Sequence, residues 1–534
     1  MGIPAYFSYI IKNHPNIIRN YNHFLNENNI DNLYFDSNSI IYDCLRDLVK
    51  IEYIHGTNKF EHELICMVCN KLLSYINIIK PTKNIIIAFD GVAPVAKMEQ
   101  QRCRRYKTII EKKILKKIKN IDEHFWDKTC ITPGTNFMNK LNINVTKFFK
   151  DIKLNVENII VLGSNIPGEG EHKLFDYIKN NKSIHYSTST VVYGLDADLI
   201  MLGLLHSHYC KSIYLYRETP EFIKQLNKQL NNNKQYFLNI QIFKKEILKK
   251  MNIGEIQVNY QKNRLYDYIF LCFLLGNDFL PHFPALNLRK NGMNTILDCY
   301  DKTIKKTTKS IIYKNTIQWP LFRKFVAGLI KQEEELIKAD HTNKISKIHH
   351  SWTIEEKLNR LPQYSKRTEQ IIQVGKTGWQ ERYYQELFFV DKTPKICKSI
   401  CQNYLEGLEW TFKYYTTGCC NWDWSYKWSY PPLLQDLYLH VPIKYKQFIK
   451  ENNNSIHPVV QLAYVLPPIH HHLLDTTLAK KLRTQYGRYY VGMPNEDGIP
   501  QLDFIWAFCR YFWECHVHLP EIPEAMLKDI NGGT

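Results

Sequence analysis

The sequence has no apolar segment long enough to cross a membrane. A transmembrane helix needs about 18 or more consecutive apolar residues, and the longest run here, residues 268–275, is soon followed by Asn277 and Asp278. The N-terminus lacks a basic segment followed by an apolar one, so we expect no secretory signal. Internal repeats and glycine/serine-rich linkers are also missing. These absences favour a globular protein without a membrane-spanning segment.

Cysteine is present but forms no recognisable framework. The chain has 14 cysteines, and the CxxC formed by Cys66 and Cys69 has no second pair to complete a zinc site. The histidines at 470–472, and those at 516 and 518, have no cysteines at zinc-finger spacing. We therefore interpret the cysteines as small buried apolar residues of a protein from a reducing compartment.

Positive charge exceeds negative charge, with 70 Lys and Arg against 52 Asp and Glu and a net charge of +18 over 534 residues. Such a balance favours a polyanionic partner, nucleic acid above all. The alternative explanation is an A/T-rich genome, which raises the lysine content for reasons unrelated to binding. Because 44% of the residues are hydrophobic, the chain can form sizeable folded cores rather than a disordered polymer.

Strand-like runs alternate with helical stretches over residues 1–301. The runs lie at residues 33–35, 85–89, 159–162 and 191–193. This alternation predicts an α/β unit with a mainly parallel central sheet flanked by helices. The next stretch is rich in Lys, Thr and Glu and is interpreted as a partly helical connector. Beyond it the aromatic residues become dense, which predicts a second, aromatic-rich α+β region packed against the first.

Acidic residues follow three of these runs, and further acids stand in two short motifs. On its own, each acid fits a helix cap or a turn. Because the carboxyl ends of parallel strands meet at one edge of a sheet, we expect the acids to converge. Two like charges about 4 Å apart repel by about 4 kcal/mol at an effective dielectric constant near 20, so such a cluster needs cations. Oxygen ligands suit Mg²⁺ or Mn²⁺ rather than zinc, and paired hard cations serve phosphoryl displacement. The candidates are Asp36, Asp90, Glu169, Glu171, Asp196, Asp198 and Asp278.

A basic helical segment follows the second of these acids. A helix that presents such a face beside an acidic site can hold a terminal phosphate by charge-assisted, bidentate hydrogen bonds. Arg102 points elsewhere on the same helix, and we expect the basic continuation at residues 107–119 to be exposed. The alternative is a solvated basic face without a ligand. Four residues share the face, at helical offsets of 0, 4, 7 and 8: Lys97, Gln101, Arg104 and Arg105.

The motifs that contain these residues closely resemble, in their order and content, those of the XRN family of 5′→3′ exoribonucleases. The resemblance continues into the second half of the chain, through residues 404–407, 422–432, 463–468 and 513–520. Within residues 1–282 the motifs are MGIP at 1–4, LYFDSN at 33–38, FDGVAP at 89–94, ITPGT at 131–135, PGEGEHK at 167–173, YGLDADL at 193–199 and GNDFLPH at 276–282.

The resemblance implies a fold and a set of roles. It implies a PIN-like 5′-nuclease domain over residues 1–301, a variable connector over 302–368, and a second region over 369–534 that closes the active site. The seven acids match the family's ligands for two Mg²⁺ ions, which Mn²⁺ can replace. The four residues of the basic face match its ligands for the 5′-monophosphate of RNA. Because none of the acids is substituted, we expect an active enzyme.

The expected function is an Mg²⁺-dependent, processive 5′→3′ exoribonuclease that degrades 5′-monophosphorylated, decapped RNA to mononucleotides. One alternative is a structure-specific 5′ flap endo- or exonuclease acting on DNA, because flap endonucleases resemble the family in the acid cluster. The other is a non-catalytic RNA-binding scaffold. We expect a monomeric minimal catalytic core that binds single-stranded RNA; recruitment by the decapping machinery stays open. Without a bipartite nuclear signal, the default expectation is a cytoplasmic location, with a nuclear one left open.

One residue departs from the family pattern. Where relatives usually carry a His that stacks on the first base, this chain has Tyr42, six residues after Asp36. Tyr also presents a flat ring, so we expect it to keep the stacking role. In the second region we choose Trp424 over Trp422 as the ring towards which the bases pack. The alternative is that these rings belong to the hydrophobic core.

Overall fold

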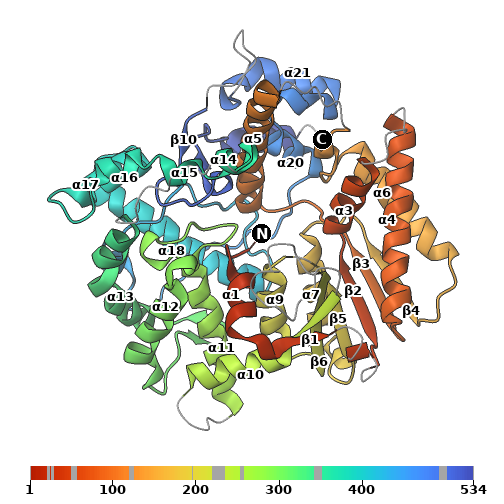
Figure 1. Cartoon of the computed structure of the whole chain (residues 1–534), viewed down its shortest axis with the longest axis horizontal. Coiled ribbons are helices and arrows are strands. Elements are labelled where there is room, and N and C mark those ends of the chain that lie inside the picture. Colours follow the sequence, from red (N-terminus) through yellow and green to blue (C-terminus); the bar gives the residue numbers. More distant parts are fainter. Residues whose placement is uncertain are drawn as a thin grey trace.

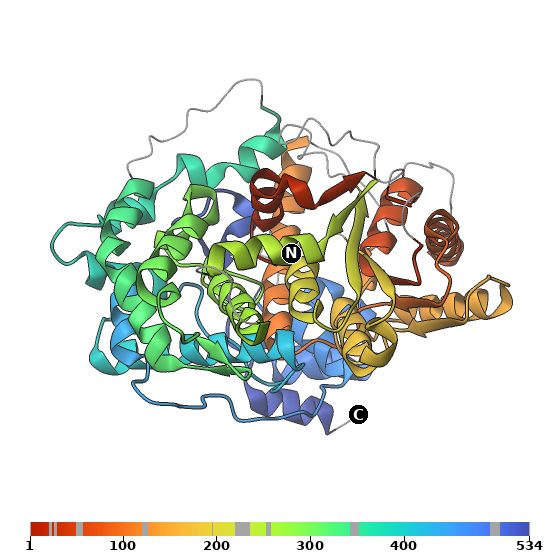
Figure 2. The same ribbon diagram turned by 90° about the horizontal axis from the view of Figure 1, so that it is seen from below.

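The structure is a computed structural model that describes residues 2–20, 24–25, 29–49, 57–119, 126–194, 196–218, 235–252, 258–341, 352–491 and 502–532. A seven-stranded sheet with its covering helices makes up one side of the molecule, and a mainly helical part makes up the other (Figure 1). Figure 2 shows the two parts side by side, with the green helices of the second half packed next to the sheet. Among the described residues, no helix combines the length and apolar character needed to cross a bilayer.

The central sheet has the strand order β1-β7-β6-β5-β2-β3-β4. The strands from β6 to β4 are parallel, whereas β7 pairs antiparallel with β6 and with β1. This confirms the predicted mainly parallel sheet, in which each of the four predicted runs forms a strand. The strands are β1 (Ile18–Asn20), β2 (Asn32–Asp36), β3 (Asn84–Ala88), β4 (Asn158–Leu162), β5 (Ser189–Tyr193), β6 (Ser212–Glu218) and β7 (Gln235–Asn239).

Successive side chains of the central strands enter two different cores. Leu33 and Phe35 of β2 pack in one core, and Tyr34 between them packs in the other, as the alternation of a strand requires. All residues of β2 and β3 are buried, because helices cover both faces of the sheet. One face is covered by α3 (Asn38–Val49), α4 (Thr57–Ile79) and α6 (Asn136–Asp151), and the other by α1 (Tyr6–Asn13), α7 (Gly170–Asn180) and α9 (Asp198–His206).

The stretch interpreted as a connector contributes to the core. It contains α13 (Trp319–His341), and Trp319, Phe322 and Phe325 are buried in the same core that holds Tyr34. The domain boundaries at 301 and 368 stay a prediction. Further α-helices and strands between the sheet and the C-terminal part of the chain are α10 (Ile240–Met251), α11 (Val258–Cys272), α12 (Gly292–Tyr300), β8 (Ile312–Tyr313), β9 (Thr316–Ile317), α14 (Ile354–Asn359), α15 (Leu361–Tyr364), α16 (Arg367–Ile372), α17 (Trp379–Phe388), α18 (Pro394–Thr416) and α19 (Leu434–His440). The short α8 (Lys182–His185) precedes β5.

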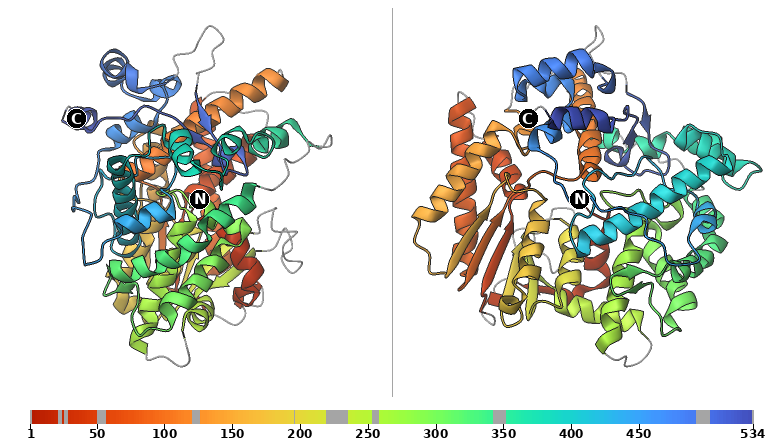
Figure 3. Two further views of the ribbon diagram at one scale, coloured as in Figure 1. Left: turned by 90° about the vertical axis from the view of Figure 1, so that its left-hand side faces the viewer. Right: turned by 180° about the vertical axis from the view of Figure 1, so that it is seen from behind.

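The long helix α5 (Val95–Lys119) joins the sheet to the C-terminal part, beside which it runs in both views of Figure 3. The Arg102 guanidinium is 1% exposed and donates hydrogen bonds to the carbonyls of Tyr489 (2.8 Å) and Pro520 (2.9 Å). Lys107 donates to the carbonyls of Trp513 and Cys515, both at 2.8 Å. The expectation of an exposed segment is therefore wrong at Lys107, because the C-terminal part covers this side of the helix. That part contains α20 (Pro458–Val465), α21 (Thr476–Gln485), β10 (Phe504–Ile505), β11 (His516–Val517) and α22 (Glu524–Asn531).

Candidate active site

Three neighbouring strands of the sheet lead into acidic residues. Asp36 is the last residue of β2, and Asp90 lies two residues beyond the end of β3. Asp196 and Asp198 follow β5, and Asp198 is the first residue of α9. Because β5, β2 and β3 are adjacent and parallel, their carboxyl ends lie at one edge of the sheet. The predicted convergence of these acids follows from that topology.

Two glutamates reach the same edge from the start of α7. Glu169 precedes the first residue of this helix, and Glu171 lies in its first turn. Carboxylate oxygens of Asp36, Asp90 and Glu171 lie within 4.8 Å of one another. Gly170 makes this approach feasible, because a Cβ at that position would lie 2.9 Å from Oδ1 of Asp36. A larger residue there would push the helix away from the acids.

Lys97 lies among the acids rather than apart from them. Its Nζ is 2.5 Å from Oε2 of Glu169 and 2.6 Å from Oδ2 of Asp278. Burial opposes the charged form of Lys97, but the carboxylates of Asp278 and Glu169 outweigh it and hold the lysine pKa well above its usual value. Burial also acts to raise the pKa of Asp278, yet the Lys97 ammonium helps to lower it to about 2. One predicted phosphate ligand therefore also compensates the charge of two acids.

At three other acids the negative charge is poorly compensated by the protein. Burial, followed by repulsion from Asp90, raises the pKa of Asp36 well above its ordinary value. Burial and the neighbouring carboxylates do the same to Glu171. Burial and repulsion from Asp196 raise the pKa of Asp198 to about 8. Buried like charges of this kind stabilise bound cations, because a cation replaces their repulsion by attraction.

The donor set fits Mg²⁺ or Mn²⁺. Its carboxylates offer oxygen ligands, which hard cations prefer, and the buried Oδ1 of Asp198 has no hydrogen-bond partner. Within the part of the chain that the structure describes, the groups of three or more side chains close enough to hold a metal both lie in this cluster. They are Asp36 with Asp90 and Glu171, and Glu169 with Glu171 and His172.

Side chains without a predicted role hold two of the acids in place. The Asn38 side chain and the backbone N–H of Gly170 (2.7 Å) each donate to one oxygen of Asp90. The Tyr414 hydroxyl, near the end of α18, donates to Oε1 of Glu169 at 2.7 Å. Asn38 stands in the motif at residues 33–38, which carries the family resemblance, so the sequence offered a signal for a role of Asn38 in the site. Tyr414 lies 245 residues after Glu169, and no spacing in the sequence connects the two.

The other three predicted phosphate-binding residues follow Lys97 along α5. Gln101 accepts a 3.3 Å hydrogen bond from Nε2 of Gln461, and Arg105 donates to Oγ1 of Thr132 at 2.7 Å. The Nη1 of Arg105 is buried without a partner, and burial lowers its pKa to about 10. Arg104 is exposed. The structure therefore leaves hydrogen-bonding capacity on this face, and the role of its residues as phosphate ligands stays a prediction.

The two stacking candidates occupy different surroundings. Tyr42 is 39% exposed, and its phenol interacts electrostatically with the guanidinium of Arg104. Trp424 is partly buried and stacks on Trp410, with ring centroids 5.2 Å apart and an interplanar angle of 26°. Trp422 is buried in a third hydrophobic core, which the C-terminal part of the chain forms with residues around the start of α5. Stacking of RNA bases on Tyr42 and Trp424 stays a prediction.

Models of known protein families match most of the chain. A family model described as "XRN 5'-3' exonuclease N-terminus" matches residues 1–219. A second model, described as "Xrn1 helical domain", matches residues 259–368 and 339–485. The first match contains six of the seven acids, and the second contains Asp278 and the aromatic residues of α18.

Curated relatives match over nearly the full length of the chain. The chain is 28% identical to "5'-3' exoribonuclease 1" of Saccharomyces cerevisiae, over 82% of this chain and 37% of the yeast protein. It is 25% identical to "5'-3' exoribonuclease 2" of Arabidopsis thaliana, over 93% of this chain and 62% of the plant protein. It is also 25% identical to "5'-3' exoribonuclease 2" of Gallus gallus, over 99% of this chain and 69% of the Gallus gallus protein. The chain thus spans between about a third and two thirds of the length of these relatives.

Proposed function

The chain belongs to the XRN family of 5′-3′ exonucleases, and on this basis we propose that it is a processive 5′→3′ exoribonuclease acting on single-stranded RNA with a 5′-monophosphate. The observation that carries the proposal is the gathering of the unsubstituted acids at the carboxyl edge of the sheet, next to the cationic face of α5. A flap nuclease on DNA or a non-catalytic scaffold would not require both features together.

We propose that the acids hold two divalent cations, Mg²⁺ or Mn²⁺. Asp36, Asp90 and Glu171 form one ligand set, because their oxygens already lie within 4.8 Å of one another. Asp196 and Asp198 form the other. When bound, a pair of such ions supplies the charge that activates a water molecule and stabilises the leaving oxygen in a phosphodiester hydrolysis. The protein contributes the positions of the carboxylates and a buried surrounding that excludes bulk water.

The cationic face of α5 would select the end of the RNA. Lys97 lies among the acids, and Arg104 and Arg105 both follow about two helical turns further along α5. The free Nη1 of Arg105 and the exposed guanidinium of Arg104 are suited to charge-assisted hydrogen bonds with a phosphate. A group anchored here places the first phosphodiester bond near the acids. A cap or a triphosphate would add bulk and charge that this face does not match.

The decisive experiment follows the degradation of one labelled RNA with different 5′ ends. The RNA carries a 5′-monophosphate, a 5′-triphosphate or a 5′-hydroxyl, and a DNA flap of matched sequence tests the alternative nuclease. We expect mononucleotides from the monophosphorylated RNA with Mg²⁺ or Mn²⁺, and no product with EDTA. Cleavage of the DNA flap in preference to RNA would contradict the proposal. Binding of RNA without any cleavage would favour the scaffold.

A further inference from the structure

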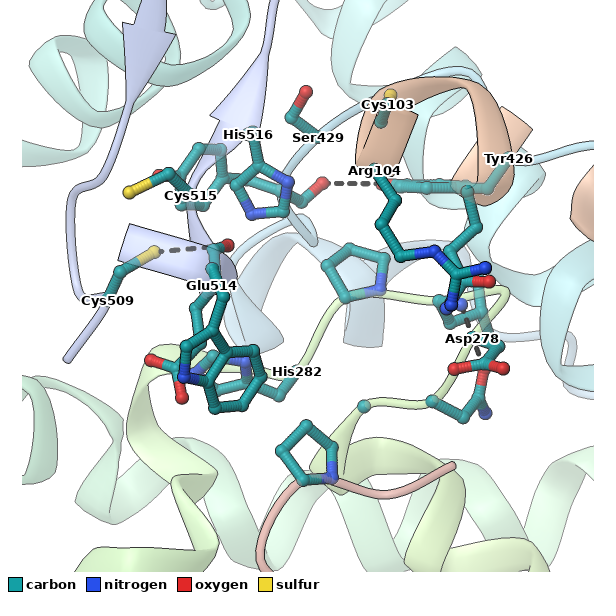
Figure 4. A pocket seen from close by; sticks show the side chains of 18 of the residues that line it. Cys103, Arg104, Asp278, His282, Tyr426, Ser429, Cys509, Glu514, Cys515 and His516 are labelled. Carbon is teal, nitrogen blue, oxygen red and sulfur yellow. Dashed lines mark hydrogen bonds between the residues drawn. The ribbon is translucent and has the colours of Figure 1, made fainter. Parts of the chain in front are cut away.

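A cavity of about 530 Å³ lies on the side of α5 that faces the C-terminal part of the chain. The helix contributes Glu99, Cys103 and Lys107 to its wall, and the loop after α11 and the segment from Tyr426 to Tyr430 contribute two more walls. Figure 4 shows Arg104 and Asp278 at one end of this cavity, and Cys509, Glu514, Cys515 and His516 at the other. Pockets that bind small organic ligands typically have volumes of about 300–1,000 Å³, so the size of this cavity suits such a ligand.

The cavity meets the candidate active site at two residues. Of the acids, Asp278 lines it, and of the four predicted phosphate ligands, Arg104 lines it. Tyr42 and Trp424, towards which the RNA bases are predicted to pack, are outside its lining. Arg104 lines the cavity and interacts electrostatically with Asp278, which also lines it, and with Tyr42, which does not.

The walls of the cavity carry cationic, aromatic and imidazole groups, together with the carboxylates of Glu99, Glu111, Asp278 and Glu514. Arg289 is held by a 2.5 Å ion pair with Glu514 and lies 5.7 Å from the centre of the Trp513 ring. Lys107 is held by two main-chain carbonyls. The Nε2 of His282 is buried without a hydrogen-bond partner. Cationic groups suit a phosphate, and an imidazole or an aromatic face suits a base without much preference for its identity.

The chemistry of the proposed reaction creates a need for such a place. Water adds to the phosphorus, the bond from phosphorus to the 3′-oxygen of the first nucleotide breaks, and that oxygen leaves as a hydroxyl. The released nucleotide keeps its own 5′-phosphate, and the shortened RNA gains a new one. Both phosphates compete for the same cationic face. A processive enzyme must therefore move the first phosphate away while the RNA stays bound.

We propose that this cavity receives the released nucleoside 5′-monophosphate, handed over by Arg104, so that the product occupies a space that the predicted base-stacking residues do not line. The inference rests on the proposed exoribonuclease function. It assigns a product site to residues of α5, of the loop after α11 and of the C-terminal part, none of which is required for the hydrolytic step apart from Asp278 and Arg104.

The test blocks the cavity from the α5 side. Cys103→Trp fills it, and Ile109→Trp on the same helix, outside the lining, is the matched control. With enzyme in excess, cleavage of the first nucleotide from 5′-monophosphorylated RNA should stay within twofold of wild type in both variants. Cleavage of the following nucleotides should slow at least tenfold in Cys103→Trp alone, because the first product still occupies the site. Equal slowing of the first and later steps, or no slowing, would overturn the proposal. A wild-type protein that degrades no RNA would instead refute the proposed function.

A second variant tests product binding without filling the cavity. AMP and UMP should inhibit degradation by the wild-type protein, and His282→Ala should raise the inhibition constant of both at least fivefold. Its first-nucleotide rate should stay within twofold of wild type, because His282 has no part in hydrolysis. Inhibition constants that are unchanged in His282→Ala, or wild-type protein insensitive to millimolar AMP and UMP, would show that the cavity does not hold the product.

Discussion

The Tyr414 hydroxyl donates a 2.7 Å hydrogen bond to Oε1 of Glu169, while Oε2 of the same carboxylate pairs with Lys97 at 2.5 Å. Both oxygens of one acid are thus held, one from the first half of the chain and one from the second. The Tyr414 ring also stacks on Trp410 at 4.8 Å, and Trp410 stacks on Trp424. A column of aromatic rings therefore connects a predicted base-stacking residue to the acid cluster.

Removing the Tyr414 hydroxyl should lower the rate of RNA degradation without disrupting the packing of the hydrophobic core. Tyr414→Phe keeps the stacked ring and loses a hydrogen bond to a charged group, which is typically worth about 1.5–3 kcal/mol. We expect a degradation rate lower by about tenfold to a hundredfold, together with a higher Mg²⁺ concentration for half-maximal rate. Tyr384→Phe is the control, because it removes a 2.9 Å hydrogen bond to Asp436 away from the acids. Equal effects of the two variants on the Mg²⁺ requirement would contradict this prediction.

The acids after β5 should be essential for hydrolysis but not for folding. Asp196→Asn or Asp198→Asn removes a ligand charge and leaves packing intact, so we expect no measurable RNA degradation and near-normal RNA affinity. Gel assays and fluorescence anisotropy measure the two properties. Asp151→Asn, at the exposed end of α6, should behave as wild type. Near-normal turnover of either site variant at saturating Mg²⁺ would rule out the assignment of these acids as metal ligands.

Metal ions should stabilise the folded protein. Burial and repulsion raise the pKa of Asp198 to about 8, so the metal-free cluster opposes folding near neutral pH. Mg²⁺ at a hundredfold its dissociation constant should raise the free energy of unfolding by about 2.7 kcal/mol, seen as a higher melting temperature than in EDTA. Asp198→Asn should melt at a higher temperature than wild type in EDTA and respond less to Mg²⁺. A melting temperature that is the same in Mg²⁺ and EDTA would argue against a resident metal.

The guanidiniums of α5 should determine the preference for the 5′ end. Arg104→Ala combined with Arg105→Ala removes charge-assisted contacts worth about 1.5–3 kcal/mol each. The preference for a 5′-monophosphate over a 5′-hydroxyl should shrink at least tenfold, measured as the ratio of initial rates. Lys112→Ala with Lys113→Ala removes the same charge from the same helix and should leave the ratio unchanged. If both double variants alter it equally, general electrostatic attraction explains the preference.

Tyr42 should retain the RNA between cycles. Its ring is 39% exposed beside Arg104, and base stacking is worth about 1–3 kcal/mol. Tyr42→Ala should therefore shorten the runs on long RNA far more than Tyr42→Phe or Tyr42→His, as read from degradation with an excess of unlabelled competitor RNA. Tyr313→Ala removes a similarly exposed ring in β8 and serves as control. A wild-type run length in Tyr42→Ala would show that Tyr42 does not stack on the RNA and only lines the site.

Sequence alone determined four of the seven strands of the sheet and the places of the acids that follow them. The apolar runs that became β2, β3, β4 and β5 are short and bounded by turns, and parallel strands bring their carboxyl ends to one edge whatever the rest of the chain does. Asp36, Asp90 and Asp198 therefore converge by topology. The helical period likewise put Arg104 and Arg105 on the same face of α5 as Lys97.

Only the tertiary structure decided which groups complete the site. Lys97 lies between Glu169 and Asp278, Lys107 binds carbonyls of the C-terminal part, and Tyr414 reaches an acid 245 residues away. These contacts depend on how α5 and α18 pack against the sheet. Packing is set by the summed fit of many side chains, each weak and without a sequence spacing of its own. A local pattern can therefore mark where a strand or helix forms, but not which distant side chain it will meet.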